Sequence, residues 1–209
     1  MVKLLIIVAI VFMLLLTAEY LWRVKHYHSE ITRKFVHISV GSFAAFWPWM
    51  ITRSQIELIA LAFLAVIILS RVFTIFSSIH LIGRKTVGEI FFALSIGGVA
   101  LITPNRYIFM AALLQLSIAD GMAAIIGTNF GQRFRYTVFG HSKSLLGSLT
   151  FLICSVTILA VYFFLSHANS AWPTLIWLPI VATLLENVGI SGSDNILVPV
   201  TVAVVLRLL

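Results

Sequence analysis

The chain has 209 residues, of which 61% are hydrophobic and only 10% are charged, and its mean hydropathy is +1.09. Soluble domains are typically about half apolar and about a quarter charged, so this composition excludes an ordinary soluble protein and predicts an integral membrane protein. The net charge is +7, but no soluble basic domain and no RNA- or DNA-binding motif is present, so a nucleic-acid polymer is not an expected partner. The single cysteine, Cys154, excludes a disulfide framework.

Eight apolar segments follow one another along the chain. The first ends in Tyr20, Trp22, Arg23 and Lys25, an aromatic and basic boundary that favours a retained membrane helix over a cleaved signal peptide. A spanning helix needs about 20 residues, so the short second, fourth, seventh and eighth segments leave seven or eight crossings. We predict an all-α, polytopic integral membrane protein that forms one helical domain over residues 1–209. The segments are 2–22, 35–51, 55–76, 87–103, 106–127, 144–165, 171–187 and 196–209.

The basic residues predict the orientation in the membrane. If all eight segments cross, the connections near 23–34, 77–86, 128–143 and 188–195 share one side. Nine basic residues lie on that side and four lie opposite, so the positive-inside rule makes the first side cytoplasmic. In a prokaryote the protein would lie in the plasma membrane. The nine are Arg23, Lys25, Arg33, Lys34, Arg84, Lys85, Arg133, Arg135 and Lys143, and the four are Lys3, Arg53, Arg106 and Arg207.

Five of the seven acidic residues fall at the cytoplasmic level of this topology. Asp120 and Glu186 lie inside apolar segments, where a carboxylate costs roughly 2.5 to 3.5 kcal/mol, so we interpret them as functional. Glu30 and Glu89 lie at segment starts, where a lysine one turn away or the helix dipole would equally explain them. Asp194 precedes the last segment.

Basic side chains are expected at the same depth. The stretch EITRKFVH contains Arg33, Lys34 and His37, and the stretch FGHSKSLLGS contains Lys143 and Ser144. Carboxylates beside cations suit a divalent metal with bound phosphates, because acids hold the metal and basic side chains neutralise phosphate oxygens. His37 is equally well explained as an interfacial histidine, and no standard nucleotide-binding motif is present.

Small residues recur every four positions at Ala123, Gly127 and Gly131. This spacing allows two helices to approach closely. The same stretch, GTNFG, also lies where a helix would emerge beside a phosphate, and glycine allows the backbone to come close. The sequence leaves both readings open.

Four stretches together resemble the motif series of the dolichol kinase and phytol kinase family, relatives of the phosphatidate cytidylyltransferases. They are RKFVH (33–37), ADGMAAIIGTNFG (119–131), HSKSLLGSLTF (141–151) and LLENVGISGSDNILVP (184–199). The resemblance implies a polytopic enzyme that uses CTP, with Mg²⁺ or another divalent cation, to phosphorylate a long-chain isoprenoid alcohol of the dolichol, polyprenol or phytol type. The cytidylyltransferase branch has a glutamate where this chain reads KSLLGS, which favours the kinase branch.

The resemblance also implies roles for individual residues. Asp120, Asp194 and Lys143 would be catalytic, and Asp120, Asp194 and Glu186 would hold the metal. The family pattern often has a second acid where this chain has Ser193, so one carboxylate fewer is expected at the site. Other candidates are Glu89, Asn187 and Asn195, and the predicted nucleotide contacts are Gly127, Asn129, Gly131, Lys143, Ser144, Arg33, Lys34 and His37.

Two alternatives stay open at the level of the sequence. One is transfer of CMP from CTP to a lipid phosphate, as in the cytidylyltransferases. The other is a small proton- or ion-coupled transporter, whose intramembrane acids would form a relay near the midplane. The expected gathering of acids at one level favours an enzyme whose site faces the cytoplasm, with membrane lipid, an isoprenoid alcohol and a nucleotide as partners. The sequence does not predict an oligomeric state.

Overall fold

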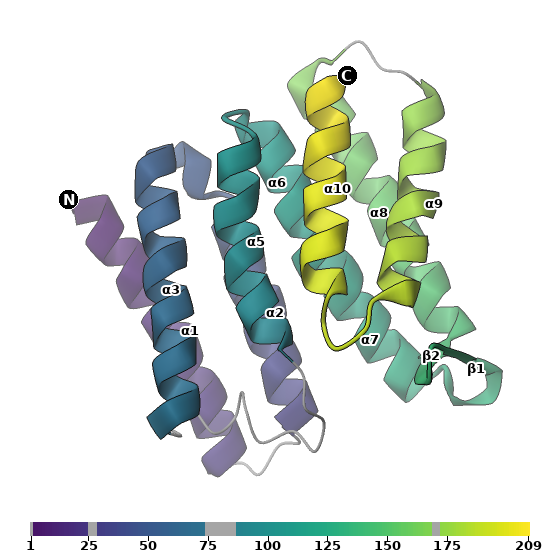
Figure 1. Ribbon diagram of the computed structural model, residues 1–209, viewed down its shortest axis with the longest axis horizontal. Helices are drawn as coiled ribbons and strands as arrows, with labels where there is room; N and C mark the ends of the chain where they lie inside the picture. Colours follow the sequence, from purple (N-terminus) through teal and green to yellow (C-terminus); the bar gives the residue numbers. More distant parts are fainter. Residues whose placement is uncertain (1, 25–28, 74–86, 169–171) are drawn as a thin grey trace.

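The computed structural model describes residues 2–24, 29–73, 87–168 and 172–209. Long helices lie side by side and alternate in direction, with α1 and α3 at one edge and α8 and α9 at the other (Figure 1). The elements in chain order are α1 (Val2–Arg23), α2 (Ser29–Ala44), η1 (Trp47–Trp49), α3 (Arg53–Phe73), α5 (Gly88–Ile102), α6 (Arg106–Leu114), η2 (Gln115–Ala119), α7 (Asp120–Asn129), η3 (Gln132–Phe134), β1 (Arg135–Val138), β2 (His141–Ser144), α8 (Leu145–Ser166), α9 (Trp172–Val188) and α10 (Asp194–Leu208).

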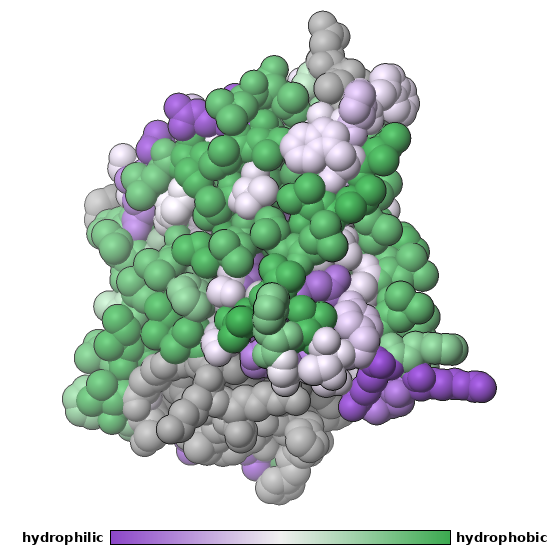
Figure 2. Space-filling view, turned by 45° about the vertical axis from the view of Figure 1, so that its right-hand side comes forward, coloured by the Kyte–Doolittle hydropathy of each residue, from purple (hydrophilic) through white to green (hydrophobic). Residues whose placement is uncertain are grey.

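Four described helical stretches are long and apolar enough to cross a membrane, namely Val2–Leu21, Arg53–Ser70, Arg106–Asn129 and Leu145–Ser166. The segments predicted to be short are α2, α5, α9 and α10, with 16, 15, 17 and 15 residues. At about 1.5 Å per residue these helices are shorter than the roughly 30 Å of a bilayer core. The count of seven or eight crossings stays a prediction, whereas the mostly hydrophobic outer surface in Figure 2 is that of a membrane protein.

The continuous stretch α6–η2–α7 is the central helix of the bundle. In its apolar window 72% of the residues are buried, against 17% to 28% in the other three long helices. The π-helical turn η2 interrupts its regular hydrogen bonding, and its first residue, Gln115, donates from Nε2 to the carbonyl of Ser155 in α8 at 3.2 Å. Such turns are rare and frequently occur at functional sites. Here the π-turn ends directly before Asp120.

Helix α2 packs closely against the central helix because glycines lie at the contact between the two. A Cβ on Gly41 would lie 2.6 Å from the Ser117 Cβ, and a Cβ on Gly121 would lie 2.7 Å from the Ile38 Cδ1. Both distances are shorter than real Cβ contacts, so the two helices approach at these points only with glycine. This close packing brings the basic side chains of α2 to the start of α7.

The prediction of an all-helical chain was wrong at one place. Strands β1 and β2 form an antiparallel hairpin, in which Tyr136 pairs with Lys143. The two residues of the turn, Phe139 and Gly140, have φ values of 47° and 78°, the positive values typical of tight hairpin turns. The rest of the described chain is helical or forms short connections, so the predicted fold class is otherwise confirmed.

The connections alternate between the two ends of the bundle as the predicted topology requires. The hairpin, the start of α5 and the turn between α9 and α10 lie in the lower half of Figure 1, and η1 and the α5–α6 connection lie at the top. Lys25, Arg84 and Lys85 lie outside the described residues, as does the side chain of Glu30. That the lower end faces the cytoplasm stays a prediction.

Candidate active site

Asp120 lies at the first position of α7 and is held by two side chains from α2. Lys34 Nζ lies 2.8 Å from Asp120 Oδ2, and His37 Nε2 lies 3.0 Å from the same oxygen. His37 Nε2 also lies 2.7 Å from the carbonyl oxygen of Leu116. All three side chains are buried. The acid that seemed isolated in the sequence therefore has a buried cation beside it, which reduces the cost of its burial.

Glu186 lies near the end of α9 and pairs with Lys143 from β2. Lys143 Nζ donates to the Glu186 carboxylate Oε1 at 2.5 Å and to the Glu186 backbone carbonyl at 2.8 Å. Burial lowers the pKa of Lys143, but the Glu186 carboxylate outweighs this effect, and the pKa of Lys143 is raised above its ordinary value of 10.5. Lys143 is therefore a permanent cation at physiological pH.

Asp194 begins α10, after a tight turn that aims its side chain inward. Ser191 and Gly192 in this turn have positive φ values of 54° and 91°, and the Ser193 hydroxyl accepts a hydrogen bond from the Ile190 backbone N–H at 3.0 Å. Within the described residues, no hydrogen-bond donor meets the buried Oδ1 of Asp194. A buried carboxylate oxygen without a donor is costly, so a ligand at this position would be stabilised.

The three carboxylates meet at one place. One oxygen from each of Asp120, Glu186 and Asp194 lies within 4.8 Å of the others. Three carboxylates meet two lysine side chains here, Lys34 and Lys143, so the acidic groups outnumber the lysines. The cluster therefore suits the binding of a cation. The predicted metal-ligand set Asp120, Glu186 and Asp194 is brought together, and Lys143 from the predicted catalytic set is beside it.

The predicted nucleotide contacts at the glycines form a closely packed joint between α7 and α8. A Cβ on Gly127 would lie 2.7 Å from Ser144 Oγ, and a Cβ on Gly147 would lie 3.0 Å from the Ala123 carbonyl oxygen. Ser144 caps α8, because its Oγ accepts a hydrogen bond from the Gly147 backbone N–H at 3.1 Å. Gly131 also faces Ser144. These contacts account for the small residues by packing, and a phosphate contact at this joint stays a prediction.

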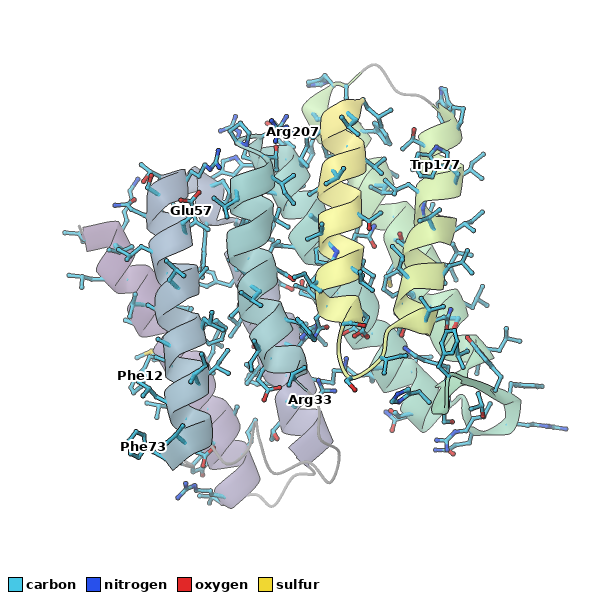
Figure 3. The ribbon with its side chains drawn as sticks, viewed as in Figure 1. Phe12, Arg33, Glu57, Phe73, Trp177 and Arg207 are labelled. Carbon is cyan, nitrogen blue, oxygen red and sulfur yellow. The ribbon has the colours of Figure 1, made fainter. Side chains whose placement is uncertain are left out.

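The remaining predicted residues lie at different places around the cluster. Asn129 is exposed at the end of α7. Arg33 and Glu89 line a narrow cleft next to His37, together with Asn195, whose Nδ2 donates to the Gly88 carbonyl at 2.9 Å. Arg33 is at the lower part of α2 in Figure 3, whereas Glu57 and Arg207 lie at the opposite end of the bundle.

Tyr136 is a residue of the site that the sequence did not reveal. Its hydroxyl donates to Asn187 Oδ1 at 2.5 Å and lies 2.5 Å from Ser148 Oγ, which itself donates to Asn187 Oδ1 at 2.8 Å. This network ties the hairpin to α8 and α9. Because Tyr136 and Lys143 are paired across the hairpin, the network also places Lys143. The alternation in RYTVFGHSKS and its Phe139-Gly140 turn were the available signals.

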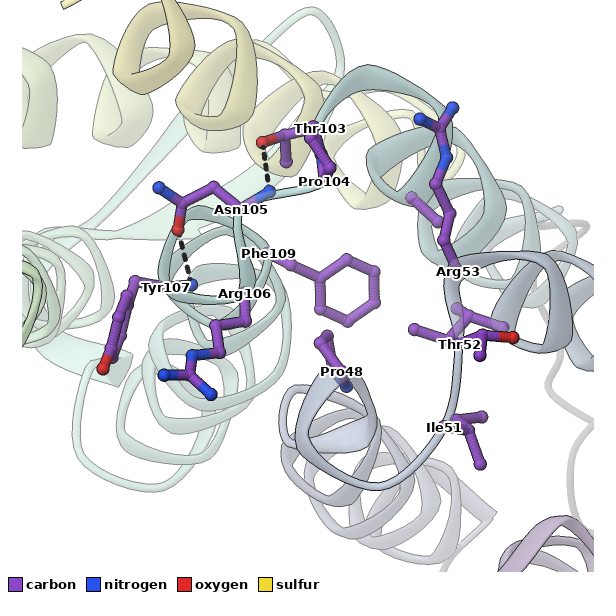
Figure 4. A pocket seen from close by; sticks show the side chains of 12 residues that line it. Pro48, Ile51, Thr52, Arg53, Thr103, Pro104, Asn105, Arg106, Tyr107 and Phe109 are labelled. Carbon is purple, nitrogen blue, oxygen red and sulfur yellow. Dashed lines mark hydrogen bonds between the residues drawn. The ribbon is translucent and has the colours of Figure 1, made fainter.

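A wide hollow lies far from this cluster. It has a volume of about 620 Å³ and lies at the opposite end of the bundle, where Pro48, Arg53, Thr103, Arg106 and Phe109 line it (Figure 4). Arg53 is paired there with Glu57 at 2.9 Å. No carboxylate of the described residues lines this hollow. We therefore place the candidate active site at the carboxylate cluster and not at this hollow.

Comparison with known proteins gives one clear relative. The chain is 35% identical over 200 residues to a phytol kinase from Synechocystis sp., and the match covers 91% of this chain and 84% of that protein. No model of a known protein family matches the chain, and no solved structure matches it either. A match of this identity over nearly the full length of both proteins shows common descent, and the chain therefore belongs to the phytol kinase family.

Proposed function

We propose that this protein is a CTP-dependent lipid kinase, which transfers the γ-phosphoryl group to the hydroxyl of a long-chain isoprenoid alcohol at the cytoplasmic face. The observation that carries the proposal is the meeting of three carboxylates with Lys34 and Lys143 at one depth of the bundle. The relative in Synechocystis sp. is named a phytol kinase, and this name supports an isoprenoid alcohol as acceptor. Dolichol and polyprenol are acceptors of the same chemical type.

The residues fit a divalent cation such as Mg²⁺. Hard cations prefer carboxylate oxygens, and Asp120, Glu186 and Asp194 supply them within 4.8 Å of one another. The contacts to Lys34 and Lys143 use Oδ2 of Asp120 and Oε1 of Glu186, so each carboxylate has a second oxygen for another partner. When bound, the cation would neutralise charge on the nucleotide phosphates.

In the proposed reaction the alcohol oxygen forms a bond to the γ-phosphorus of CTP. The bond from that phosphorus to the oxygen bridging to the β-phosphate breaks, and CDP leaves with this oxygen. The hydroxyl hydrogen passes to a side chain beside the cluster, for which we propose His37, because its Nε2 lies 3.0 Å from Asp120 Oδ2 and the carboxylate would stabilise the protonated ring. Catalysis of this kind depends mainly on positioning and on charge stabilisation.

Lys143 has the role of stabilising negative charge on the transferring phosphoryl group. It is charged, and its two acceptors among the described residues both belong to Glu186, so one of its three donors can bind a phosphate oxygen. Lys34 and His37 fix Asp120 through contacts at 2.8 Å and 3.0 Å. Their direct contact with the nucleotide, like that of Arg33 and Ser144, belongs to the prediction from the family resemblance.

A labelled-nucleotide assay tests the proposal. Purified protein is incubated with γ-labelled CTP, Mg²⁺ and phytol in detergent micelles, with Asp120→Asn as the inactive control. We expect the label in phytyl phosphate. Label in pyrophosphate would instead establish nucleotidyl transfer to a lipid phosphate. Solute flux in proteoliposomes without nucleotide turnover would establish a transporter. Replacing CTP by ATP, GTP or UTP in the same assay tests the choice of nucleotide.

A further inference from the structure

A narrow cleft lies beside the carboxylate cluster, between α2, α3 and α5. Four apolar side chains form its walls, Val36 from α2, Phe63 and Ile67 from α3, and Phe92 from α5. The rings of Phe63 and Phe92 meet edge to face with their centroids 6.3 Å apart. The space in the cleft is about 40 Å³, somewhat more than the roughly 30 Å³ that one water occupies in the liquid. It therefore suits one small group, of about the size of a hydroxymethyl end.

The polar end of this cleft is shared with the carboxylate cluster. His37 lines the cleft, where its ring lies 4.9 Å from that of Phe92, and it also contacts Asp120. Asn195 lines the cleft as well, and it directly follows Asp194 in α10. A group that enters between the apolar walls therefore meets two polar side chains. One is His37, which contacts Asp120, and the other is Asn195, the residue after Asp194.

The contacts of His37 decide which of its ring nitrogens carries hydrogen. Nε2 lies 2.7 Å from the Leu116 carbonyl oxygen and 3.0 Å from Asp120 Oδ2. Both partners of Nε2 are acceptors when Asp120 is ionised, so Nε2 carries the hydrogen. Both polar contacts described for His37 use Nε2. Nδ1 is then the nitrogen that remains for a hydroxyl group.

Lys143 and the hairpin approach the cluster from the other side. Lys143 contacts Glu186 at the end of α9. In Figure 1 the hairpin and α9 lie on one side of α10, whereas α3 and α5 lie on the other. A nucleotide bound at Lys143 and an acceptor bound in the cleft would therefore meet at the carboxylates from opposite sides. Opposed approach is the arrangement that an in-line phosphoryl transfer requires.

The two helices that form the longer walls of the cleft also expose apolar side chains. Val66 on α3 and Leu94 on α5 are examples. An alcohol with a long hydrocarbon tail can therefore place its hydroxyl in the cleft while its tail stays among the lipids. The tail needs no internal tunnel for this arrangement.

We propose that the acceptor alcohol enters sideways from the bilayer between α3 and α5, with its hydroxymethyl end in the cleft, beside His37 and Asn195 and against Phe63, Ile67 and Phe92. This inference rests on the proposed function and adds the position of the acceptor to it. The side chains at Phe63 and Ile67 then determine which alcohol ends are admitted.

A matched pair of substitutions on α3 tests this position. Ile67→Phe enlarges a buried wall of the cleft, and Ile68→Phe makes the same change at the next residue, which is 48% exposed. We expect Ile67→Phe to raise the KM for phytol at least about tenfold with the KM for CTP within twofold of wild type, and Ile68→Phe to leave both unchanged. Adding Phe63→Ala to Ile67→Phe should restore part of the affinity for phytol. An unchanged KM for phytol, or a rise in the KM for CTP instead, overturns the proposal.

Photo-crosslinking tests the position without turnover or substitution. A phytol analogue with a diazirine near its hydroxyl end is irradiated with wild-type protein, and the labelled peptides are identified by mass spectrometry. We expect label on α3 and α5 that excess phytol removes. Competed label on α8 or α9 instead contradicts the cleft. A wild-type protein that fails to phosphorylate any isoprenoid alcohol but labels on α3 and α5 would overturn the proposed function and leave the alcohol site standing.

Discussion

Lys34 and Asp120 are 86 residues apart in the sequence, and their side chains form a buried ion pair with Nζ 2.8 Å from Oδ2. The pair joins α2 to the central helix directly after the π-turn η2. Removing one partner of a buried pair leaves an uncompensated charge, which typically costs several kcal/mol. The pair therefore couples the packing of α2 to the electrostatics of the carboxylate cluster.

Replacing Asp120 by asparagine tests the centre of the cluster. Asp120→Asn keeps the shape of the side chain and removes its charge, so we expect kinase activity to fall at least about a hundredfold, as for the loss of a major electrostatic element. Thermal unfolding of the purified protein checks that the fold persists. The control is Glu57→Gln, which removes a paired carboxylate at the opposite end and should leave activity near normal. Near-normal activity in Asp120→Asn would remove this residue from the mechanism.

The pair of Lys143 with Glu186 gives a prediction on pH. Because the pKa of Lys143 is raised in the folded protein, the stabilising contribution of its charge is still fully present as the pH rises to 10.5, and it is lost as the pH rises through the raised value. We expect the melting temperature of wild type to exceed that of Lys143→Met by a constant margin between pH 7 and pH 9.5, and the margin to shrink above pH 10.5. A margin that shrinks between pH 7 and pH 9 would contradict the assignment.

Metal binding can be measured without activity. If Asp194 helps to hold the cation, wild-type protein should bind Mn²⁺, followed by electron paramagnetic resonance, and Asp194→Asn should weaken the Kd at least about tenfold, since loss of a charged ligand typically costs more than 1.4 kcal/mol. Chelation by EDTA should abolish kinase activity, and added Mg²⁺ should restore it. Equal Mn²⁺ affinity in wild type and Asp194→Asn would exclude Asp194 as a ligand.

The grouping of the acids could be predicted from the sequence, because a carboxylate in an apolar segment is costly and needs partners. Asp120, Glu186 and Asp194 were expected at one level, and the structure brings them within 4.8 Å. Their individual partners could not be predicted. That Lys34 serves Asp120 while Lys143 serves Glu186 depends on how α2 and β2 pack, and the sequence spacing contains no information on this packing.

The two local departures from regular helix were not predicted from the sequence. A π-turn inside a nearly continuous apolar segment leaves hydrophobic periodicity uninformative, because almost every face is apolar. The hairpin was overlooked because each strand has only four residues. For the glycines the sequence allowed either close helix packing or close approach to a phosphate. The contacts of Gly127 and Gly147 between α7 and α8 are those of close packing.

Tyr136 should influence the reaction although it lies outside the cluster. Tyr136→Phe removes the hydroxyl that bonds to Asn187 and Ser148, so Lys143, its partner across the hairpin, is held less firmly. A buried hydrogen bond contributes about 1 kcal/mol, so we expect kcat to fall about fivefold. The melting temperature should stay within a few degrees of that of wild type. Tyr107→Phe, in the hollow at the opposite end, is the control. Equal activity in both variants would separate the network from catalysis.

The orientation in the membrane can be tested at the tip of the hairpin. Phe139 is 71% exposed there, and Ser54 is exposed at the start of α3, at the opposite end of the bundle. After Cys154→Ala removes the natural thiol, Phe139→Cys and Ser54→Cys each give one reporter for a membrane-impermeant maleimide. If the basic hairpin end faces the cytoplasm, intact cells should label only Ser54→Cys and inverted vesicles only Phe139→Cys. The reverse pattern would place the carboxylate cluster on the outer side, where cytoplasmic CTP cannot reach it.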